Sequence, residues 1–202
     1  MLKTLWFHFL VFILVSGNLN AQQLGFVFNS GISQPSVGFT SNNGESLTYT
    51  ADLNPYCSIG INVRNDDIVG SLLIGSSSID ANAESTDITH SVGYRSRDIE
   101  MQLGKSIENE WIRFVMAGAG LSKLQSEYSV INGVNQVTND VKHFTQSGIF
   151  GSIQFGLRGY EAANLKINPY VNYRLGLSNL EQEGSGDVTK VSALNLGLRV
   201  EL

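Results

Sequence analysis

Four residues that lie near one another in the chain are of the types found in hydrolase sites: His90, Ser91, Glu84 and Asp87. A serine, an imidazole and a carboxylate together form the usual arrangement of a nucleophilic hydrolase. Consecutive strand residues point to opposite faces, however, which separates His90 from Ser91 if this stretch is extended. We therefore interpret these residues, and His143 near another loop base, as polar residues at loop bases. No catalytic residue and no enzyme activity are predicted.

Two other features suggest a metal site or redox chemistry. The spacing of Asp80, Asn82, Glu84 and Asp87 is similar to an oxygen-rich cation loop, but it lacks the glycine and the final acidic residue of an EF-hand. A weak surface Ca²⁺ site competes with a solvated acidic loop, and we favour the acidic loop. Cys57 is the only cysteine, so no intramolecular disulfide forms. No metal site and no cofactor are expected.

The composition restricts the class of protein. Hydrophobic residues make up 42% of the 202, which excludes a disordered chain. Charged residues make up only 15%, against about 25% in soluble domains. The net charge is −5 and no cluster of Lys and Arg is present, which argues against a nucleic-acid partner.

The first 21 residues have the three parts of a secretory signal peptide. Lys3 supplies the positive start, residues 5–15 form an apolar core, and residues 16–21 are polar and small. An uncleaved membrane anchor is the competing interpretation, but the apolar run is shorter than the roughly 20 residues of a spanning helix. We predict cleavage after Ala21 and one mature domain, residues 22–202.

The end of the chain alternates with the period of a strand. Large aliphatic residues occupy every second position from Leu194 to Leu202, with Asn195, Gly197, Arg199 and Glu201 between them. A strand with one apolar and one polar face is therefore predicted. We expect it to close a sheet by pairing with the first strand.

The same alternation recurs along the mature chain and predicts eight strands. Connections after the second, fourth and sixth strands are short, whereas the others are long and polar. Asn43-Gly44 and Asn132-Gly133, within two of the long connections, are typical of hairpin tips. The predicted strands cover residues 24–32, 56–64, 68–76, 91–103, 111–121, 149–158, 165–177 and 194–202.

Alternation alone leaves two barrels open. A soluble lipocalin-like barrel turns its apolar face inward around a ligand, and an outer-membrane barrel turns it toward lipid. The polar positions here are mostly Asn, Ser, Gln and Gly, with almost no strand lysine except Lys166, which suits a cramped, polar lumen. We predict a network of buried charges in that lumen, made of Arg64, Glu100, Arg158, Arg174, Arg199 and Glu201.

Eight alternating strands, an export signal and a terminal amphipathic strand resemble the small eight-stranded outer-membrane β-barrel family, OmpA-like or OmpX-like. The sequence Asn20–Gln23 at the end of the signal peptide is similar to barrels of the Bacteroidetes type. The resemblance implies an all-β, antiparallel, up-and-down transmembrane barrel, with periplasmic termini and four extracellular loops. One departure is Leu202, where many such barrels end in an aromatic residue that the assembly machinery recognises.

The resulting functional prediction is a small non-enzymatic outer-membrane barrel, with a filled lumen and a structural or surface-interaction role through its loops. Its expected partners are outer-membrane lipid, the barrel assembly machinery during biogenesis, and an extracellular protein or surface ligand, which strand addition at a loop edge would bind. A lipid-modifying barrel enzyme and a secreted lipocalin-like barrel remain the alternatives. Interfacial aromatic girdles are expected from Tyr56, Trp111, Phe114, Tyr170 and Tyr173.

Overall fold

The described part of the chain folds almost entirely into β-strands. The computed structural model describes residues 22–40, 46–85, 88–107, 109–133, 136–139, 145–163, 165–178, 180–181 and 188–202. The predicted signal peptide, 1–21, lies outside the described residues. No helix among the described residues is long and apolar enough to span a membrane. The strands are β1 Gln22–Thr40, β2 Ser46–Ala51, β3 Asn54–Asn65, β4 Ile68–Ser85, β5 Ile88–Ser106, β6 Ile112–Gly133, β7 Gln136–Asn139, β8 Thr145–Leu157, β9 Tyr160–Ala162, β10 Leu165–Gly176, β11 Leu180–Glu181 and β12 Val188–Glu201.

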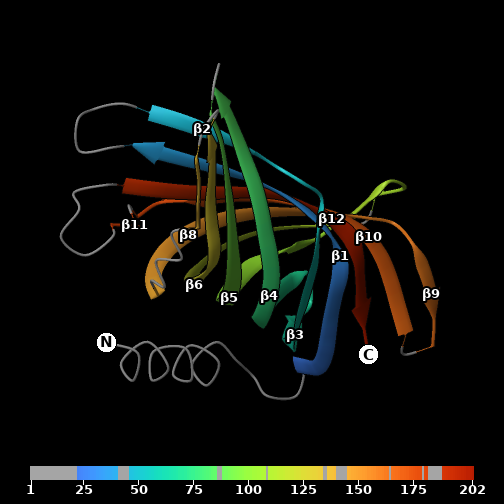
Figure 1. The fold of residues 1–202 in the computed structure, drawn as a ribbon. Coiled ribbons are helices and arrows are strands. Elements are labelled where there is room, and N and C mark those ends of the chain that lie inside the picture. Colours follow the sequence, from blue (N-terminus) through green and yellow to red (C-terminus); the bar gives the residue numbers. More distant parts are fainter. Residues whose placement is uncertain are drawn as a thin grey trace.

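Eight of these strands close into a ring (Figure 1). Each pairs antiparallel with the next in the order β1, β3, β4, β5, β6, β8, β10 and β12, and β12 returns to β1. The closing seam runs from the pair Val27–Glu201 to the pair Thr40–Val188. Beyond it, Phe26 and Leu202 exchange two backbone hydrogen bonds of 3.1 and 3.0 Å. The predicted eight-stranded antiparallel barrel, closed by its first and last strands, is confirmed.

Two of the connections predicted as polar loops, 77–90 and 122–147, are largely continuations of the barrel strands. β4 runs on to Ser85 and β5 begins at Ile88, and the two are paired throughout. β6 likewise continues to Gly133 and then pairs with β7. Asn132-Gly133 therefore ends strand β6, and residues 134–135, between β6 and β7, lie outside the described residues. The other predicted tip, Asn43-Gly44, lies outside the described residues.

The additional strands lie at the two ends of the ring and pair with the barrel strands there. β2 pairs with β1 along its length and with β4 only through Thr50 and Ala51. At the other end, β9 lies within the predicted turn 159–164 and pairs with β10. The hairpin between β3 and β4 turns on two residues, Asp66 and Asp67, with Asp66 at φ 49°. In Figure 1 the hairpin of β1 and β2 leans away from the upright ends of β4 and β5.

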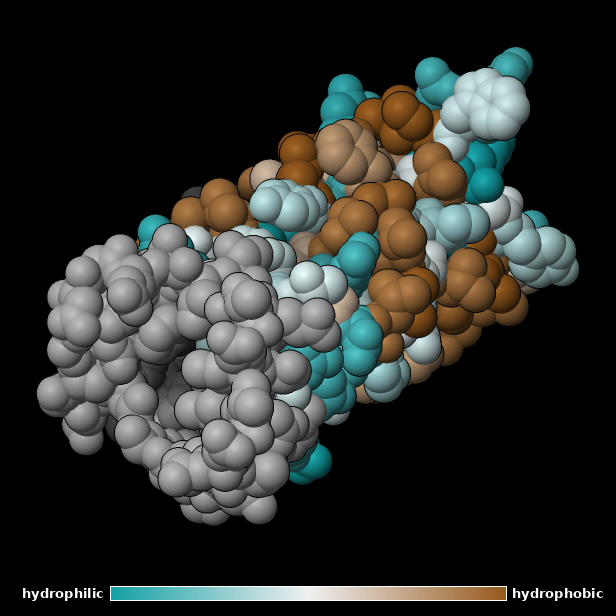
Figure 2. All heavy atoms as spheres, turned by 45° about the horizontal axis from the view of Figure 1, so that its top comes forward, coloured by the Kyte–Doolittle hydropathy of each residue, from teal (hydrophilic) through white to brown (hydrophobic). Residues whose placement is uncertain are grey.

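An apolar belt covers the outside of the ring. On β1 the belt extends from Leu24 to Ile32, about 27 Å along the strand. Because barrel strands tilt by about 40°, this length corresponds to roughly 20 Å along the barrel axis. Hydrophobic side chains gather over this part of the surface in Figure 2 and are bordered by hydrophilic ones. Exposed members include Leu24, Phe26, Phe28, Ile32, Ile59, Ile74, Leu103, Ile149, Phe155, Leu175, Leu196 and Leu198.

The polar positions of the same strands face inward. On the last strand Asn195, Arg199 and Glu201 are buried, while Leu194, Leu196 and Leu198 are exposed, as predicted. Both faces of β4 are apolar in this region, because Val69 and Leu73 point into the lumen whereas Ile74 joins the outer belt.

Candidate functional site

The lumen is crossed by a charged cluster centred on Arg174 of β10. The alternation of β10 turns Asn172 and Arg174 inward, and Arg174 is only 8% exposed. Its Nη1 donates to Asp98 Oδ2 at 2.5 Å, and its Nη2 donates to Glu100 and, at 2.8 Å, to the hydroxyl of Tyr56. One guanidinium therefore links three strands across the interior.

Polar side chains of β5 and β8 complete this cluster. Glu100 accepts hydrogen bonds from Ser152 Oγ at 2.5 Å and from Gln102 Nε2 at 2.7 Å. Gln102 also donates to Gln154 Oε1 at 2.8 Å. The guanidinium of Arg174 lies 4.7 Å from the ring centroid of Phe150, a cation–π distance. These contacts hold the carboxylates in place at the centre of the barrel.

A second charged cluster lies nearer the chain terminus. Arg199, with no exposed surface, donates through Nε to Glu201 at 2.7 Å and through Nη2 to Ser71 at 2.8 Å. Arg64 reaches the same carboxylate, Glu201, at 3.3 Å. Arg199 also lies over the ring of Phe114 at 5.2 Å. Of the six predicted buried charges, Glu100, Arg174, Arg199 and Glu201 are confirmed, Arg64 is half-buried and joins them, and Arg158 is wrong because it is exposed beyond the end of β8.

The two clusters occupy the passage through the barrel. Asp98, missed from the predicted network although it shares the inward parity of Glu100, is 2% exposed and belongs to it. Above Arg174 lies a cavity of about 60 Å³, lined by Asp98, Arg174 and Asn195 together with several serines. That volume holds a few water molecules. The arrangement is a plug, since an ion would have to break several buried hydrogen bonds to pass it.

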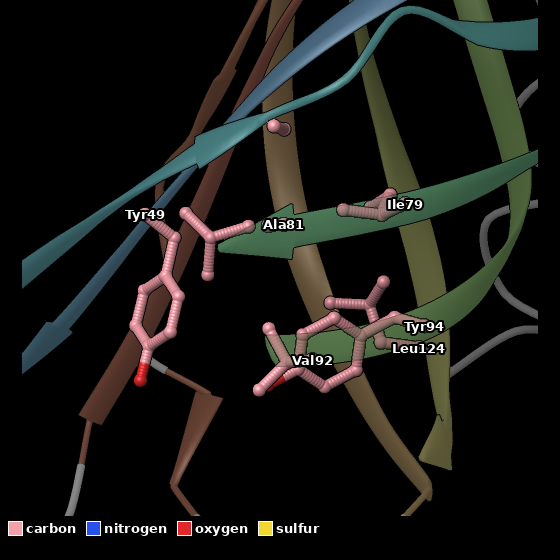
Figure 3. Packing of buried hydrophobic residues seen from close by; sticks show 8 residues of the cluster. Tyr49, Ile79, Ala81, Val92, Tyr94 and Leu124 are labelled. Carbon is pink, nitrogen blue, oxygen red and sulfur yellow. The ribbon is translucent and has the colours of Figure 1, made fainter. Parts of the chain in front are cut away.

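Above the plug, the interior becomes apolar. Residues from β1, β2, β4, β5 and β6 pack together there, several of them labelled in Figure 3. The phenol of Tyr49 belongs to this upper cluster, and burial, with a smaller contribution from Tyr94, raises the pKa of Tyr49 to about 12. The members are Val37, Tyr49, Ala51, Ile79, Ala81, Val92, Tyr94 and Leu124. Beyond the belt, then, apolar residues point inward and polar residues outward, the reverse of the membrane-facing part.

Of the residues considered for chemistry, the structure describes the backbone positions of Glu84, His90 and Ser91. The backbone of His90 pairs with Ala83 on β4 and Ile131 on β6, and Ser91 is its neighbour on β5. Asp80 and Asn82 lie on strand β4 and not in a loop. Within the described residues, no group of three or more His, Cys, Asp or Glu is placed to hold a metal ion. Asp87 and His143 lie outside those residues.

The outer surface carries Cys57 and only part of the predicted aromatic girdle. Cys57 is exposed on the lipid-facing side, since it shares the strand parity of the exposed Ile59. The aromatic girdle is wrong for three residues: Tyr56, Phe114 and Tyr170 are buried in the lumen at 2–3% exposure. Their parity matches that of inward polar neighbours, a signal already present in the sequence. Trp111 and Tyr173 are outside, at 77% and 46%, and Tyr160 at 62% joins them.

This barrel is closed, carries its apolar belt on the outside and holds a charged plug within. Such an arrangement is stable in lipid and not in water. The chain has the architecture of the small outer-membrane β-barrels. A secreted lipocalin-like barrel would require the apolar face of these strands to line the interior, and the exposed belt is the opposite arrangement.

Comparisons with known proteins found similar chains among solved structures. No family model matches the chain, and no curated protein matches it either. Among solved structures, neisserial surface protein A is 11% identical, with 88% of this chain and 96% of that one covered and a TM-score of 0.44. The attachment invasion locus protein Ail of Yersinia pestis is 12% identical, with 90% and 99% covered and a TM-score of 0.38. OprG of Pseudomonas aeruginosa is 10% identical, with 88% and 95% covered and a TM-score of 0.42. The assignment of the fold rests on the ring, belt and plug of this chain.

Proposed function

We propose that this protein is a non-enzymatic outer-membrane barrel that presents a rigid β-structured extension above the membrane for interaction at the cell surface. The observation that carries the proposal is the continuation of the strands beyond the apolar belt. β4 extends 11 residues past Ile74, roughly 36 Å of strand. The plugged lumen gives the barrel no passage for solutes. The function is therefore assigned to the extension that the barrel holds outside the membrane.

Two features support an interaction role for the extension. The described part of its interior, next to the plug, is packed with the upper apolar cluster, which stiffens the extension where it leaves the belt. One edge of it is open to pairing: among the described strands, β7 pairs only with β6, through Gln136–Asn139. A partner segment can add to such an edge through main-chain hydrogen bonds. The expected partner is an extracellular protein or surface ligand.

The orientation in the proposal places both ends of the barrel domain in the periplasm, with the extension outside the cell. Protease added to intact cells should then cut the chain beyond Gln125 and leave the belt strands as a protected fragment. Cleavage only after permeabilisation of the outer membrane would show that the extension faces the periplasm and would refute the proposed orientation.

A trimmed hairpin separates a surface role from simple support of the envelope. In the variant, residues 83–90 are replaced by Asn-Gly, which retains the pairing of β4 and β5 up to Asn82 and Ser91. The full chain and the trimmed chain are then compared for rescue of whatever phenotype deletion of the gene produces. Folding is checked by faster migration on unheated detergent gels. A folded trimmed barrel that rescues fully would contradict the surface role.

The lipid-modifying enzyme is tested separately. His90→Ala and His143→Ala, assayed on lipid substrates in detergent micelles, are expected to match the unmodified protein and to show no lipid hydrolysis. Hydrolysis by the unmodified protein that either substitution abolishes, with folding retained, would replace the non-enzymatic proposal.

A further inference from the structure

The upper edge of the apolar belt is well defined on one face of the barrel. Four outward aliphatic side chains lie in one cross-strand row, since each is the register partner of the next on β4, β5, β6 and β8. All are exposed, by 37–59% of their surface. These residues, the aliphatic row, are Ile74, Ile99, Leu121 and Ile149.

The next outward row on the same strands is cationic at its centre. It consists of Ser76, Arg97, Lys123 and Ser147, again register partners in sequence. Arg97 and Lys123 are both exposed. Successive outward positions are about 7 Å apart along a strand, so these two cations lie one step above the aliphatic row. We refer to these four residues as the cationic row.

Within the protein alone, the central pair of this row is unfavourable. Like charges directly opposite each other on neighbouring strands repel, because their Cβ atoms are only about 5 Å apart. Among the described residues neither Arg97 nor Lys123 forms an ion pair, whereas Arg95, one row further out, pairs with Glu127 at 2.7 Å. An anion between Arg97 and Lys123 would convert this repulsion into two attractive contacts.

The position of the pair identifies the kind of anion. We propose that the cationic row binds the phosphate of a phosphorylated lipid headgroup in the outer leaflet, with the acyl chains of the lipid against Ile99 and Leu121. Arg97 and Lys123 supply the charge, and the exposed hydroxyl of Ser147 lies beside them as a donor. Ser76 Oγ instead donates to the carbonyl of Ser96 at 3.1 Å. The inference rests on the proposed function, which places this end of the belt at the cell surface.

The site is confined to one face. On β1 and β12, the first outward residues beyond the belt are Gln34 and Ser192, which carry no charge. A general attraction to an anionic surface would need no such concentration of charge on β5 and β6. The row therefore fits one bound lipid at a fixed position on the barrel.

The test measures the melting temperature of the folded barrel in detergent micelles with added lipid A that carries both phosphates, with the same lipid stripped of phosphate, and with inorganic phosphate. Three proteins are compared: the full mature chain, Arg97→Gln/Lys123→Gln, and the control Arg158→Gln, which removes an exposed cation at the opposite end of the barrel. A cation near a lipid headgroup contributes roughly a fivefold gain in affinity, so the double variant should bind lipid A about 30-fold more weakly.

The proposal expects a rise in melting temperature that needs both the lipid phosphate and the two cations, with the control unchanged from the mature chain. Equal rises with phosphorylated and stripped lipid, or equal rises in the double variant and the control, would overturn it. A response to inorganic phosphate as large as that to lipid A would overturn the lipid as the occupant. A mature chain that does not fold into a heat-modifiable barrel at all would refute the proposed function itself.

Discussion

Removal of Arg174 should be among the most damaging single substitutions in the barrel. Arg174→Met keeps an unbranched apolar stem in place of the arginine stem but leaves Asp98 and Glu100, 2% and 1% exposed, without their cation. Opposite charges about 4 Å apart contribute roughly 4 kcal/mol at an effective dielectric constant of 20. Truncating one partner of a buried ion pair costs about 3–5 kcal/mol. We expect a loss of that size in the free energy of unfolding.

The loss of stability should come from the two carboxylates left without a counter-charge, and not from the smaller volume of the new side chain. Arg174→Met/Asp98→Asn/Glu100→Gln removes the whole charge set, and a neutral replacement of a buried ion cluster is often no less stable than the original. The triple variant should therefore recover most of the stability that the single variant loses. Its buried amides retain hydrogen-bonding capacity toward Ser96 and Ser152, which contact Asp98 and Glu100 in the structure.

The assay is reversible urea unfolding in lipid vesicles, followed by the fluorescence of Trp111, the only tryptophan of the mature chain, and by mobility on unheated gels. A single variant that loses less than about 1 kcal/mol would show that the plug contributes little. A triple variant as unstable as the single one would show that packing of the arginine, and not its charge, is what matters. Either result would refute the reasoning.

Three further predictions concern the belt, the packing of the lumen and the upper cluster. Leu198→Arg puts a charge in the middle of the lipid-facing surface and should cost about 2–4 kcal/mol in the same unfolding assay, whereas Ser192→Arg beyond the belt should cost little; equal losses would contradict the belt. A Cβ on Gly156 would lie 2.1 Å from the ring of Phe114, so Gly156→Ala should destabilise by about 1–3 kcal/mol and Phe114→Leu should relieve part of it; independent, additive losses would contradict this contact. Burial raises the pKa of Tyr49 to about 12, so the folded state favours the neutral phenol. The resulting contribution of Tyr49 to the free energy of unfolding is complete below pH 10 and is lost as the pH rises to about 12. In a titration of phenolate absorbance, Tyr49→Phe should remove a group that ionises near pH 12, and removal of a group that ionises near pH 10 would contradict the burial of Tyr49.

The sequence predicted the membrane part of the fold well because one physical rule governs it. Every residue of the belt strands faces either lipid or a narrow lumen, so Leu194 to Leu202 alternate without interruption. The same rule identified Arg174 and Arg199 as inward charges. It also placed Tyr56 and Phe114 inward, but they were assigned by residue type to the membrane interface. Parity along the strand, and not aromatic character, decides the side.

The extension was predicted only in part, through the hairpin tips Asn43-Gly44 and Asn132-Gly133, and its β4–β5 part was taken for a loop because the rule reverses there. In 77–94 the alternation persists, with Ile79, Ala81, Val92 and Tyr94 on one side, but these residues point inward and their polar neighbours point to water. Fewer large aliphatic residues and more serines make such strands resemble polar loops. The partners of each buried charge were also beyond sequence reasoning, since Arg174 and Asp98 are 76 residues apart and meet only when the ring has closed.

The central claim is that residues 22–202 form one closed barrel whose apolar side faces lipid. Its most direct test uses single cysteines at 194, 196 and 198, with controls at 190 and 192, in a Cys57→Ser background and with a nitroxide label in vesicles. The structure predicts that labels at 194, 196 and 198 collide with oxygen dissolved in lipid more than with a water-soluble nickel reagent, and that labels at 190 and 192 do the opposite. Greater access of the nickel reagent at 194–198 would contradict the membrane barrel.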